Sequence, residues 1–456
     1  MLTASPSRAQ TAPLAKRLWL AGVALAIFLL TCIIANNFVS PDKRLTTRSA
    51  GHDFLAFYTA GTFLRDGRVA DLYKPSAVQS FEQQLAQQEH LELGKGFGPY
   101  WNPPVFAWLF VPLASLSYTA AWWTWFAINL TCAAAALSIL CLIVTRASSP
   151  CSHPSARHNV QPTASNWRTW ALVPLLTCTS LPFIMALGHG QNTCISLLLL
   201  SAVVWFWRKN QGIPASLICG LLSYKPQLAA VIAGMLVLTQ GWRAILGLAI
   251  TGITLLTLSA LTLPGATHDW TTRLPALVKY MQIDHRYMWE RHVTLKAFWR
   301  LLLQGYDIGN SSKPAVVAWL ISIAALCFGM TFAVARTLLQ HASRDRLIAA
   351  TIASMPLLMP FYFDYDLLLL SVAAVLVARQ AITAGSFTRQ DKLQLSLWTA
   401  LFFWMFINPF VAGQTHFNGT VLLLAALSGM LIAKACEIRT QPIQQPLVSP
   451  PIALAA

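Results

Sequence analysis

The chain has 456 residues, of which 56% are hydrophobic and only 11% are charged. Soluble domains carry about 25% charged residues. This composition therefore excludes a soluble enzyme, a disordered chain and a secreted disulfide scaffold, and it leaves a polytopic helical membrane protein. Lysine and arginine number 32 against 16 aspartates and glutamates, a net charge of +16. In a membrane protein this surplus indicates cytoplasmic anchoring and contact with anionic lipid, so we expect a bilayer and no nucleic acid as partner.

The chain begins with a polar stretch, 1–17, and continues with an apolar run, 18–36, that is long enough to span a bilayer. The run is long for a signal peptide and has no clear small-residue cleavage site. We therefore expect a retained helix and a cytoplasmic N-terminal tail at 1–17. The polar segment 37–102 follows as a first long loop.

Further apolar runs recur along the rest of the chain. They lie at about 103–117, 119–145, 170–187, 193–207, 213–239, 244–263, 315–335, 347–360, 363–378, 394–412 and 418–433. Together with the first run they predict one all-α polytopic membrane domain over 18–436, with about 11–12 transmembrane or re-entrant helices, followed by a cytoplasmic tail at 437–456. Several runs are short or contain proline, which is typical of broken helices that line a buried cavity.

Basic residues in short loops orient the helices, because such loops stay in the cytoplasm. The loops around 336–346 and 379–392 are basic, so both chain termini are expected inside. The two sizeable loops 37–102 and 264–314 are then extracytoplasmic.

The middle of the chain allows two topologies. If every apolar run is a full span, the basic pair Arg208–Lys209 falls on the wrong side of the charge rule. If 103–117 and 213–239 are re-entrant, the charge rule holds and the number of membrane crossings stays even. Both topologies stay open from the sequence.

Carboxylates are rare and unevenly placed. Thirteen of the sixteen fall in the expected outer segments, and none lies between residues 93 and 268. A proton-coupled transporter is expected to carry an ionisable residue in mid-membrane, usually with a partner. The distribution therefore favours chemistry at the outer interface over transport.

Asp53 is an isolated acid in the apolar and aromatic stretch GHDFLAFYTAG, flanked by Phe54, Phe57 and Tyr58. An acid held at the lipid boundary suits a general base that takes a proton from a sugar hydroxyl. The alternative is an N-cap of a short interfacial helix, because Asp is among the best capping residues.

Lys225 lies in LLSYKPQLAA, between two apolar halves. A charge at mid-span costs about 2.5–3.5 kcal/mol, so such a residue is usually functional. The following Pro226 breaks the helix, and an ammonium at that break suits a lipid phosphate. The alternative is a lysine that snorkels to the interface.

Other polar candidates lie in the expected second outer loop and at two helix ends. Arg286, Arg291 and His292 could bind a donor phosphate, or they could belong to an amphipathic interfacial helix. The motif GHGQN, which contains Gln191, could hydrogen-bond a sugar or simply form a turn. In FDYD, Asp364 and Asp366 form an acid-x-acid pair that could hold a cation or cap a helix; we favour capping for Asp364 and leave Asp366 open. The nine cysteines have no metal-binding spacing and are expected to pack as small apolar residues.

Several of these stretches occur in the order seen in glycosyltransferase family 87, which the chain resembles over roughly 50–372. They are DFLAFYTAG with LRDGRVADLY, YWNPPVFAWLFVPLASLSYTAAWWTWFAINL, GHGQN, GLLSYKPQLAAV with GWR, and FDYDLLLLSVAA. The family comprises polyprenyl-phosphate-mannose-dependent alpha-mannosyltransferases and uncharacterised relatives. The resemblance implies a GT-C fold with an outward-facing active site and a catalytic aspartate in the first outer loop, here Asp53. This chain has Asn102 where the family often has Tyr before two prolines.

The resemblance implies transfer of a hexose, with mannose expected, from a polyprenyl-phosphate sugar to a glycan or glycolipid acceptor. The transfer would invert the anomeric carbon, on the outer face of the plasma (inner) membrane. The implied roles are a general base, Asp53; phosphate-binding groups, Lys225, Arg286, Arg291 and His292; and substrate-binding groups, Tyr58, Asn102, Gln191 and Asp366. No metal or cofactor is expected, since cations suffice for a monophosphate leaving group. A lipid-linked glycan flippase and a ligase-like enzyme with a pyrophosphate donor stay open as alternatives.

Overall fold

The computed structural model describes residues 19–30, 51–91, 97–145, 167–340, 343–384 and 388–437. Helices account for nearly all regular structure in these ranges, where the backbone pairs as β-structure only at an isolated bridge between His292 and Phe363. The prediction of an all-α polytopic membrane protein is confirmed. The two tails predicted as cytoplasmic, apart from Glu437, lie outside the described residues.

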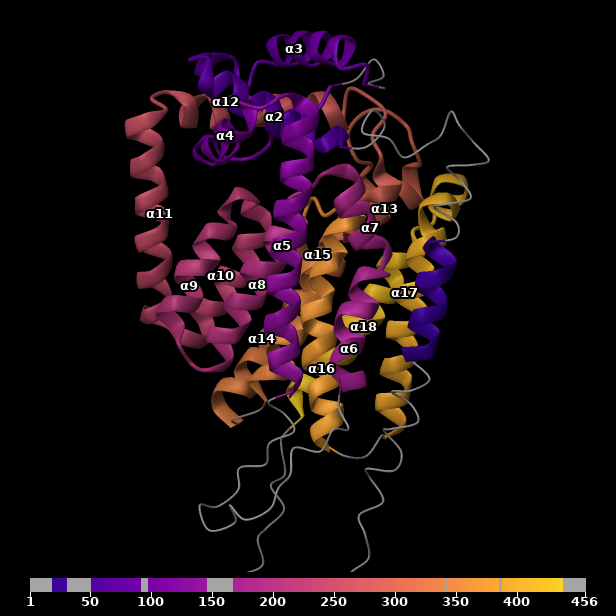
Figure 1. Ribbon diagram of the computed structural model, residues 1–456. Helices are drawn as coiled ribbons and strands as arrows, with labels where there is room; N and C mark the ends of the chain where they lie inside the picture. The colour runs from indigo at the N-terminus through magenta and orange to yellow at the C-terminus, as the bar shows by residue number, and fades with distance from the viewer. Residues whose placement is uncertain are drawn as a thin grey trace, which may run out of the picture.

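Six helices of the described chain are long and apolar enough to cross a membrane. They are α5 (Tyr118–Thr145), α11 (Trp242–Thr262), α14 (Lys313–Gln340), η8 with α16 (Asp364–Leu369 and Leu370–Ala384), α17 (Arg389–Thr415) and α18 (Gly419–Cys436). A seventh span results if α6 (Trp167–Cys178) and α7 (Leu181–His189), bent by 59°, count as one. The bundle also contains α8 (Thr193–Arg208) and α15 (Arg344–Leu358), and the apolar helix Trp19–Leu30 lies at its outer edge (Figure 1). Large apolar side chains such as Leu261, Phe328 and Phe410 are more than 70% exposed, as expected where a helix faces lipid.

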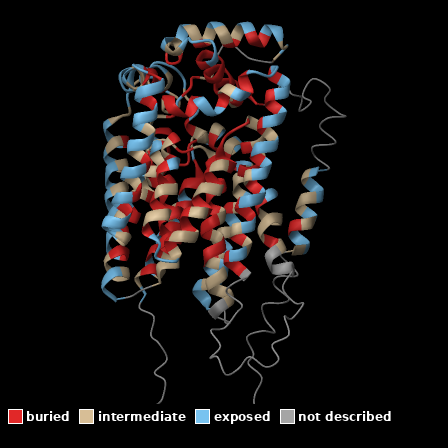
Figure 2. Ribbon diagram, turned by 60° about the vertical axis from the view of Figure 1, so that its left-hand side comes forward, coloured by how far each residue is buried: buried red, intermediate tan, exposed pale blue. Residues whose placement is uncertain are grey.

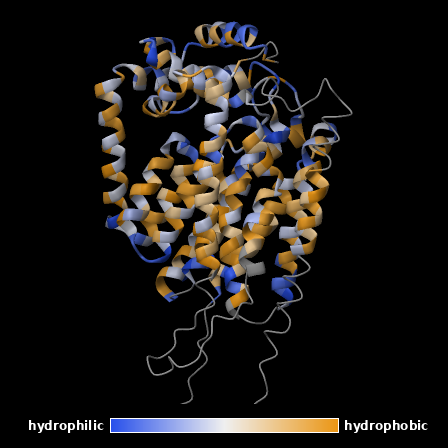
Figure 3. Cartoon of the chain, in the orientation of Figure 1, coloured by the Kyte–Doolittle hydropathy of each residue, from blue (hydrophilic) through white to orange (hydrophobic). Residues whose placement is uncertain are grey.

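The two long loops of the sequence gather at one end of the bundle (Figure 1). The first contributes α2 (His52–Arg65), η2 (Val69–Asp71) and α3 (Pro75–Gln88), and the apolar segment after it forms η3 (Pro104–Phe110) and α4 (Val111–Ala114). The second contributes α12 (Ala266–Gln282), η7 (Trp289–Arg291) and α13 (Leu295–Gln304). The indole N–H of Trp270 donates to the backbone oxygen of Trp101 across 3.0 Å and ties one loop to the other. Figure 3 shows an apolar middle of the bundle between more polar ends.

The segment 103–117 does not cross the bundle. Its helices η3 and α4 lie at the loop end and pack on α2 (Figure 1). The approach is close, because a Cβ on Gly61 of α2 would lie 2.4 Å from the backbone oxygen of Phe110. Only a glycine permits this contact.

The segment 213–239 forms a re-entrant hairpin. Helix α9 (Gly212–Leu221) leads through η6 (Leu222–Tyr224) into α10 (Pro226–Gln240). The start and the end of the hairpin touch, since a Cβ on Gly212 would lie 3.0 Å from that of Gln240. The reversal occurs at Lys225, where Pro226 supplies the first residue of α10. The structure therefore supports the re-entrant alternative for both segments.

Two packed cores position the site (Figure 2). The larger fills the centre of the bundle and includes residues of α5, α8, α15, η8, α16 and α18. The smaller is aromatic and holds α2 against η3 and α5, with Phe57 of α2 stacked on Phe110 of η3 at 4.8 Å between ring centroids. Aromatic pairs of this kind contribute about 0.5–1.5 kcal/mol beyond the area they bury.

Candidate active site

Asp53 lies in the first turn of α2, at the end of the bundle where the two loops gather. The helix is capped by Gly51, whose φ of 80° is the left-handed conformation that favours glycine, and no side chain caps it. The N–H of Gly51 donates to the backbone oxygen of Gly188 across 2.9 Å, while the Tyr118 hydroxyl donates to the Gly51 oxygen across 3.3 Å. Asp53 is therefore not the N-cap that composition allowed, and its carboxylate is available for other contacts.

The GHGQN turn brings two side chains to this carboxylate. Gln191 donates from Nε2 to Oδ2 of Asp53 across 2.8 Å, and Nδ1 of His189 lies 4.0 Å from the same oxygen. Gly190 ends α7 with a φ of 69°, and its carbonyl oxygen accepts from the indole N–H of Trp125 across 2.8 Å. The turn thus fixes one carboxylate oxygen of Asp53. The side chain remains 41% exposed.

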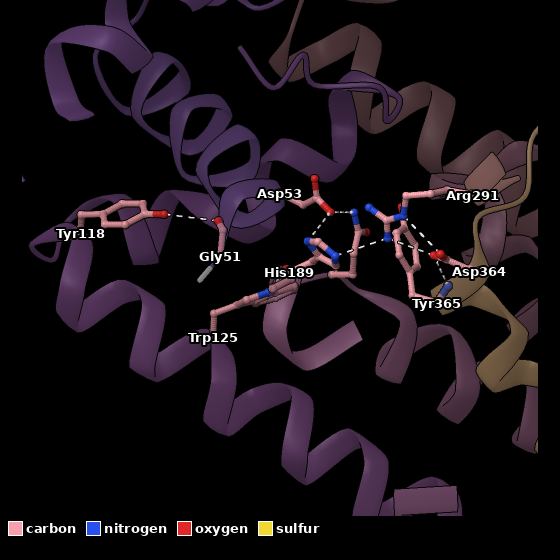
Figure 4. Close-up of polar contacts among 10 residues, drawn as sticks. Gly51, Asp53, Tyr118, Trp125, His189, Arg291, Asp364 and Tyr365 are labelled. Carbon is pink, nitrogen blue, oxygen red and sulfur yellow. Dashed lines mark hydrogen bonds and ion pairs between the residues drawn. The ribbon is translucent and has the colours of Figure 1, made fainter. Parts of the chain in front are cut away.

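Arg291 continues the network on the far side of His189 (Figure 4). Its Nε and Nη2 donate to the two carboxylate oxygens of Asp364 across 3.1 and 3.0 Å, and Nη2 lies 3.3 Å from Nε2 of His189. An arginine can only donate, so Nε2 of His189 accepts and the ring carries its proton on Nδ1, which faces Asp53. Burial lowers the pKa of Arg291, but the neighbouring Asp364 outweighs burial and raises it overall. The guanidinium is therefore permanently charged.

Lys225 and Asp366 form a second ion pair, buried inside the bundle. The ammonium of Lys225 donates to Oδ1 of Asp366 across 2.7 Å, and the Thr193 hydroxyl donates to the same oxygen across 2.9 Å. The side chains of the pair are only 10% and 6% exposed. Lys225 does not snorkel to the interface, because its charge is balanced in place.

Tyr365 lies between the two ion pairs. The Lys225 ammonium is 5.4 Å from its ring centroid, and the Arg291 guanidinium is 6.0 Å from it. The carboxylates of Asp364 and Asp366 therefore serve different cations and do not converge on one point. The structure brings together Asp53, Gln191 and Arg291 in one network, with Lys225 and Asp366 beside it across one tyrosine ring.

Four predicted site residues lie outside this network: Tyr58, Asn102, Arg286 and His292. The Tyr58 hydroxyl donates to the backbone oxygen of Leu116 across 2.8 Å within the aromatic core, and Asn102 is buried with its backbone oxygen accepting from Tyr73. Arg286 lies 4.3 Å over the ring of Tyr306. None of these contacts reaches Asp53.

His292 is fully buried and lies 4.1 Å from the ring centroid of Phe363. Burial, aided by Arg291 and Lys296, lowers the pKa of His292 to about 3. The imidazole is therefore neutral at physiological pH and has no positive charge to offer a phosphate. The histidine of the site is instead His189, which contacts Asp53 and Arg291. It belongs to the GHGQN motif, in which no separate role was predicted for it from the sequence.

The fold and the site define a class, a multi-pass membrane protein with a polar network where its loop helices meet its spans. A sequence profile of glycosyltransferase family 87 matches residues 100–361, more than half of the chain. The chain belongs to glycosyltransferase family 87 and is a membrane glycosyltransferase. No curated protein and no solved structure matches the chain. The matched range includes Gln191, Lys225 and Arg291, whereas Asp53 precedes it and Asp364 follows it.

Proposed function

We propose that this glycosyltransferase moves a hexose, with mannose expected, from a polyprenyl-phosphate sugar to a glycan or glycolipid hydroxyl. The observation that carries the proposal is the geometry of Asp53. One oxygen of its carboxylate accepts from Gln191, and Oδ1 has no hydrogen-bond partner among the described residues. A half-exposed carboxylate with one free oxygen suits a general base for an incoming hydroxyl.

Arg291 is the cation best placed for the donor phosphate. Its Nε and Nη2 are occupied by Asp364 and His189, while Nη1 has no hydrogen-bond partner among the described residues. Guanidinium N–H groups stabilise phosphate oxygens as charge develops on the leaving group. One imidazole ring separates this cation from Asp53 (Figure 4). That spacing supports a base and a phosphate-binding group on opposite sides of a bound sugar.

The proposed reaction is a single displacement at the anomeric carbon. Asp53 accepts the proton of the acceptor hydroxyl as its oxygen forms the new glycosidic bond. The bond between the anomeric carbon and the phosphate oxygen breaks, and both electrons leave with polyprenyl phosphate. Attack from the face opposite the phosphate inverts the configuration. Arg291 stabilises the departing phosphate. Lys225, which is paired with Asp366 inside the bundle, lies on the same side of the site and assists in this role.

The membrane placement follows the charge rule. We propose a GT-C-type arrangement in which the loop end carrying Asp53 faces outward from the plasma (inner) membrane and both chain termini are cytoplasmic. The ion pairs Arg208–Asp345, Arg346–Glu437 and Lys434–Asp391 involve the basic residues that the rule assigns to the inner side. Helix α8 separates the two ends, since it begins beside Asp366 and ends at Arg208.

The test is Asp53→Asn in the full-length protein in native membranes supplied with radiolabelled polyprenyl-phosphate mannose. Loss of a general base is expected to slow sugar transfer and release of polyprenyl phosphate by about 10²–10⁴-fold. Asp66→Asn is the matched control, because Asp66 ends the same helix in an exposed pair with Arg65. Transfer by Asp53→Asn at a wild-type rate would refute the proposed base. Movement of labelled lipid across the bilayer without release of polyprenyl phosphate would favour a flippase, and use of a pyrophosphate donor alone would favour a ligase-like enzyme.

A further inference from the structure

A basic pocket lies at the end of the bundle opposite Asp53. It has a volume of about 160 Å³ and is lined by Leu142, Trp205, Arg208, Lys209 and Arg379. These residues come from the ends of three neighbouring helices, α5, α8 and α16. Helix α8 has 16 residues, so its rise of 1.5 Å per residue places the pocket about 24 Å from the candidate active site. The pocket is therefore separate from the site of sugar transfer.

The pocket has more positive charge than its carboxylate can balance. Asp345 is the only acid within 4 Å of these three cations in the described part of the chain, and it pairs with both Arg208 and Arg379. Lys209 has no ion pair among the described residues; its ammonium lies 4.1 Å over the ring of Trp205. Two of the three cations thus share one carboxylate, and the third is unpaired among the described residues. This excess attracts an anion.

One donor in the pocket is buried and unused. Arg379 donates from Nη1 to Asp345 across 2.8 Å, but its Nε is buried and has no hydrogen-bond partner among the described residues. A buried donor without a partner costs about 1–3 kcal/mol. An anionic oxygen bound beside Arg379 would satisfy it.

The apolar side of the pocket identifies the kind of anion. Leu142 belongs to the membrane-spanning helix α5 and is 46% exposed, so it lies on the surface that faces lipid. Trp205 presents a ring near the end of α8, and tryptophan is enriched at the boundary between hydrocarbon and water. A free inorganic anion gains nothing from such a wall, whereas the acyl chains of a phospholipid pack against it. Basic pockets between membrane helices are known to bind anionic headgroups.

We infer that the pocket of Arg208, Lys209 and Arg379 binds the phosphodiester headgroup of an anionic phospholipid, with its acyl chains along Leu142. Lys209 and the unused Nε of Arg379 contact the phosphodiester, while Asp345 holds the two guanidinium groups in place. The inference does not depend on the donor, the acceptor or the catalytic role of Asp53.

The experiment is native mass spectrometry of the full-length protein in mild detergent, titrated with phosphatidylglycerol or with phosphatidylcholine of the same acyl chains. Wild-type protein is expected to retain phosphatidylglycerol in preference to phosphatidylcholine. Lys209→Gln is expected to weaken phosphatidylglycerol binding about fivefold, the effect of one basic residue at a membrane surface. Lys209→Arg is expected to restore it. Lys209 makes no ion pair with the described residues, so these variants leave the Asp345 pairs intact.

Arg243→Gln is the matched control. Arg243 is another exposed cation beside a tryptophan, 5.9 Å from the ring of Trp242, but it does not line the pocket. Equal retention of the two lipids, an unchanged affinity in Lys209→Gln, or an equal loss in Arg243→Gln would overturn the inference. Displacement of phosphatidylglycerol by millimolar inorganic phosphate would assign the pocket to free anions and overturn the lipid. Persistence of the lipid in phosphate supports it.

Discussion

Gln191 donates a hydrogen bond to Asp53 across 2.8 Å, although 138 residues separate the two in the sequence. The bond joins the GHGQN turn to the first turn of α2. This contact brings two short sequence motifs together in one candidate site. Gln191 holds Oδ2 of the Asp53 carboxylate, and Oδ1 has no hydrogen-bond partner among the described residues.

Replacement of Gln191 by leucine tests whether this bond positions the base. A hydrogen bond to a charged group contributes about 1.5–3 kcal/mol, so kcat is expected to fall about ten- to a hundredfold while KM for the lipid donor changes little. Gln87→Leu, at an exposed position of α3, is the control. Initial rates over a range of donor concentrations separate the two parameters. An unchanged kcat would show that Asp53 needs no help from this turn.

Gly190→Ala tests the turn itself. A Cβ there would lie 2.6 Å from the Trp122 ring and 2.8 Å from Cβ of Phe54, at a φ of 69°. Strain and overpacking together are expected to cost about 2–4 kcal/mol and to lower the melting temperature. Gly188→Ala, two residues earlier, meets nothing within 4 Å and is expected to be tolerated. Equal thermal unfolding of the two variants would contradict this reading of the turn.

Arg291→Lys tests which cation serves the donor. Lysine keeps the charge but loses the fork that binds Asp364 and His189, so KM for the donor is expected to rise and transfer to fall about tenfold or more. Arg286→Lys is the comparison, since Arg286 lies over Tyr306 and outside the Asp53 network. Its transfer rate is expected to match the wild type. Kinetics with polyprenyl-phosphate sugar decide between them, and a larger defect in Arg286→Lys would reverse the assignment.

The buried carboxyl group of Glu82 is expected to make the stability of the loop end depend on pH. This fully buried residue of α3 accepts from the N–H of Gly98 across 2.7 Å and from the Thr59 hydroxyl. Burial raises the pKa of Glu82 from 4.5 to about 8, although both hydrogen bonds oppose the rise. The folded chain therefore holds a proton that the unfolded chain releases. The stabilisation is fully present below pH 4.5 and is lost as pH rises through 8.

Hydrogen exchange of the α3 amides between pH 5 and pH 9, corrected for intrinsic rates, measures this effect. Protection in the wild type is expected to fall with rising pH by at least the tenfold that one pKa unit represents. Glu82→Gln mimics the protonated carboxyl, so its protection is expected to stay constant. A wild-type profile as flat as that of the variant would mean that Glu82 stays in one protonation state.

The class of protein and the neighbourhood of the site could be predicted from the amino-acid sequence alone. Hydropathy and charge are local properties, and they were enough to predict an all-α membrane protein. The family resemblance, carried by short ordered motifs, was confirmed by the profile match. The isolation of Asp53 among aromatic residues also singled it out, because few carboxylates compete with it in so acid-poor a chain.

Which polar residues contact one another became clear only from the fold. Three candidate phosphate-binding residues lie within seven positions and look equivalent in the sequence. In the fold, Arg291 pairs with Asp364 and Arg286 lies over the ring of Tyr306. His292 is buried among aromatic rings. Lys225 and Asp366 pair across 141 residues because the re-entrant hairpin turns back beside η8. Such pairs depend on how whole helices pack, and the spacing of residues along one segment does not contain that information.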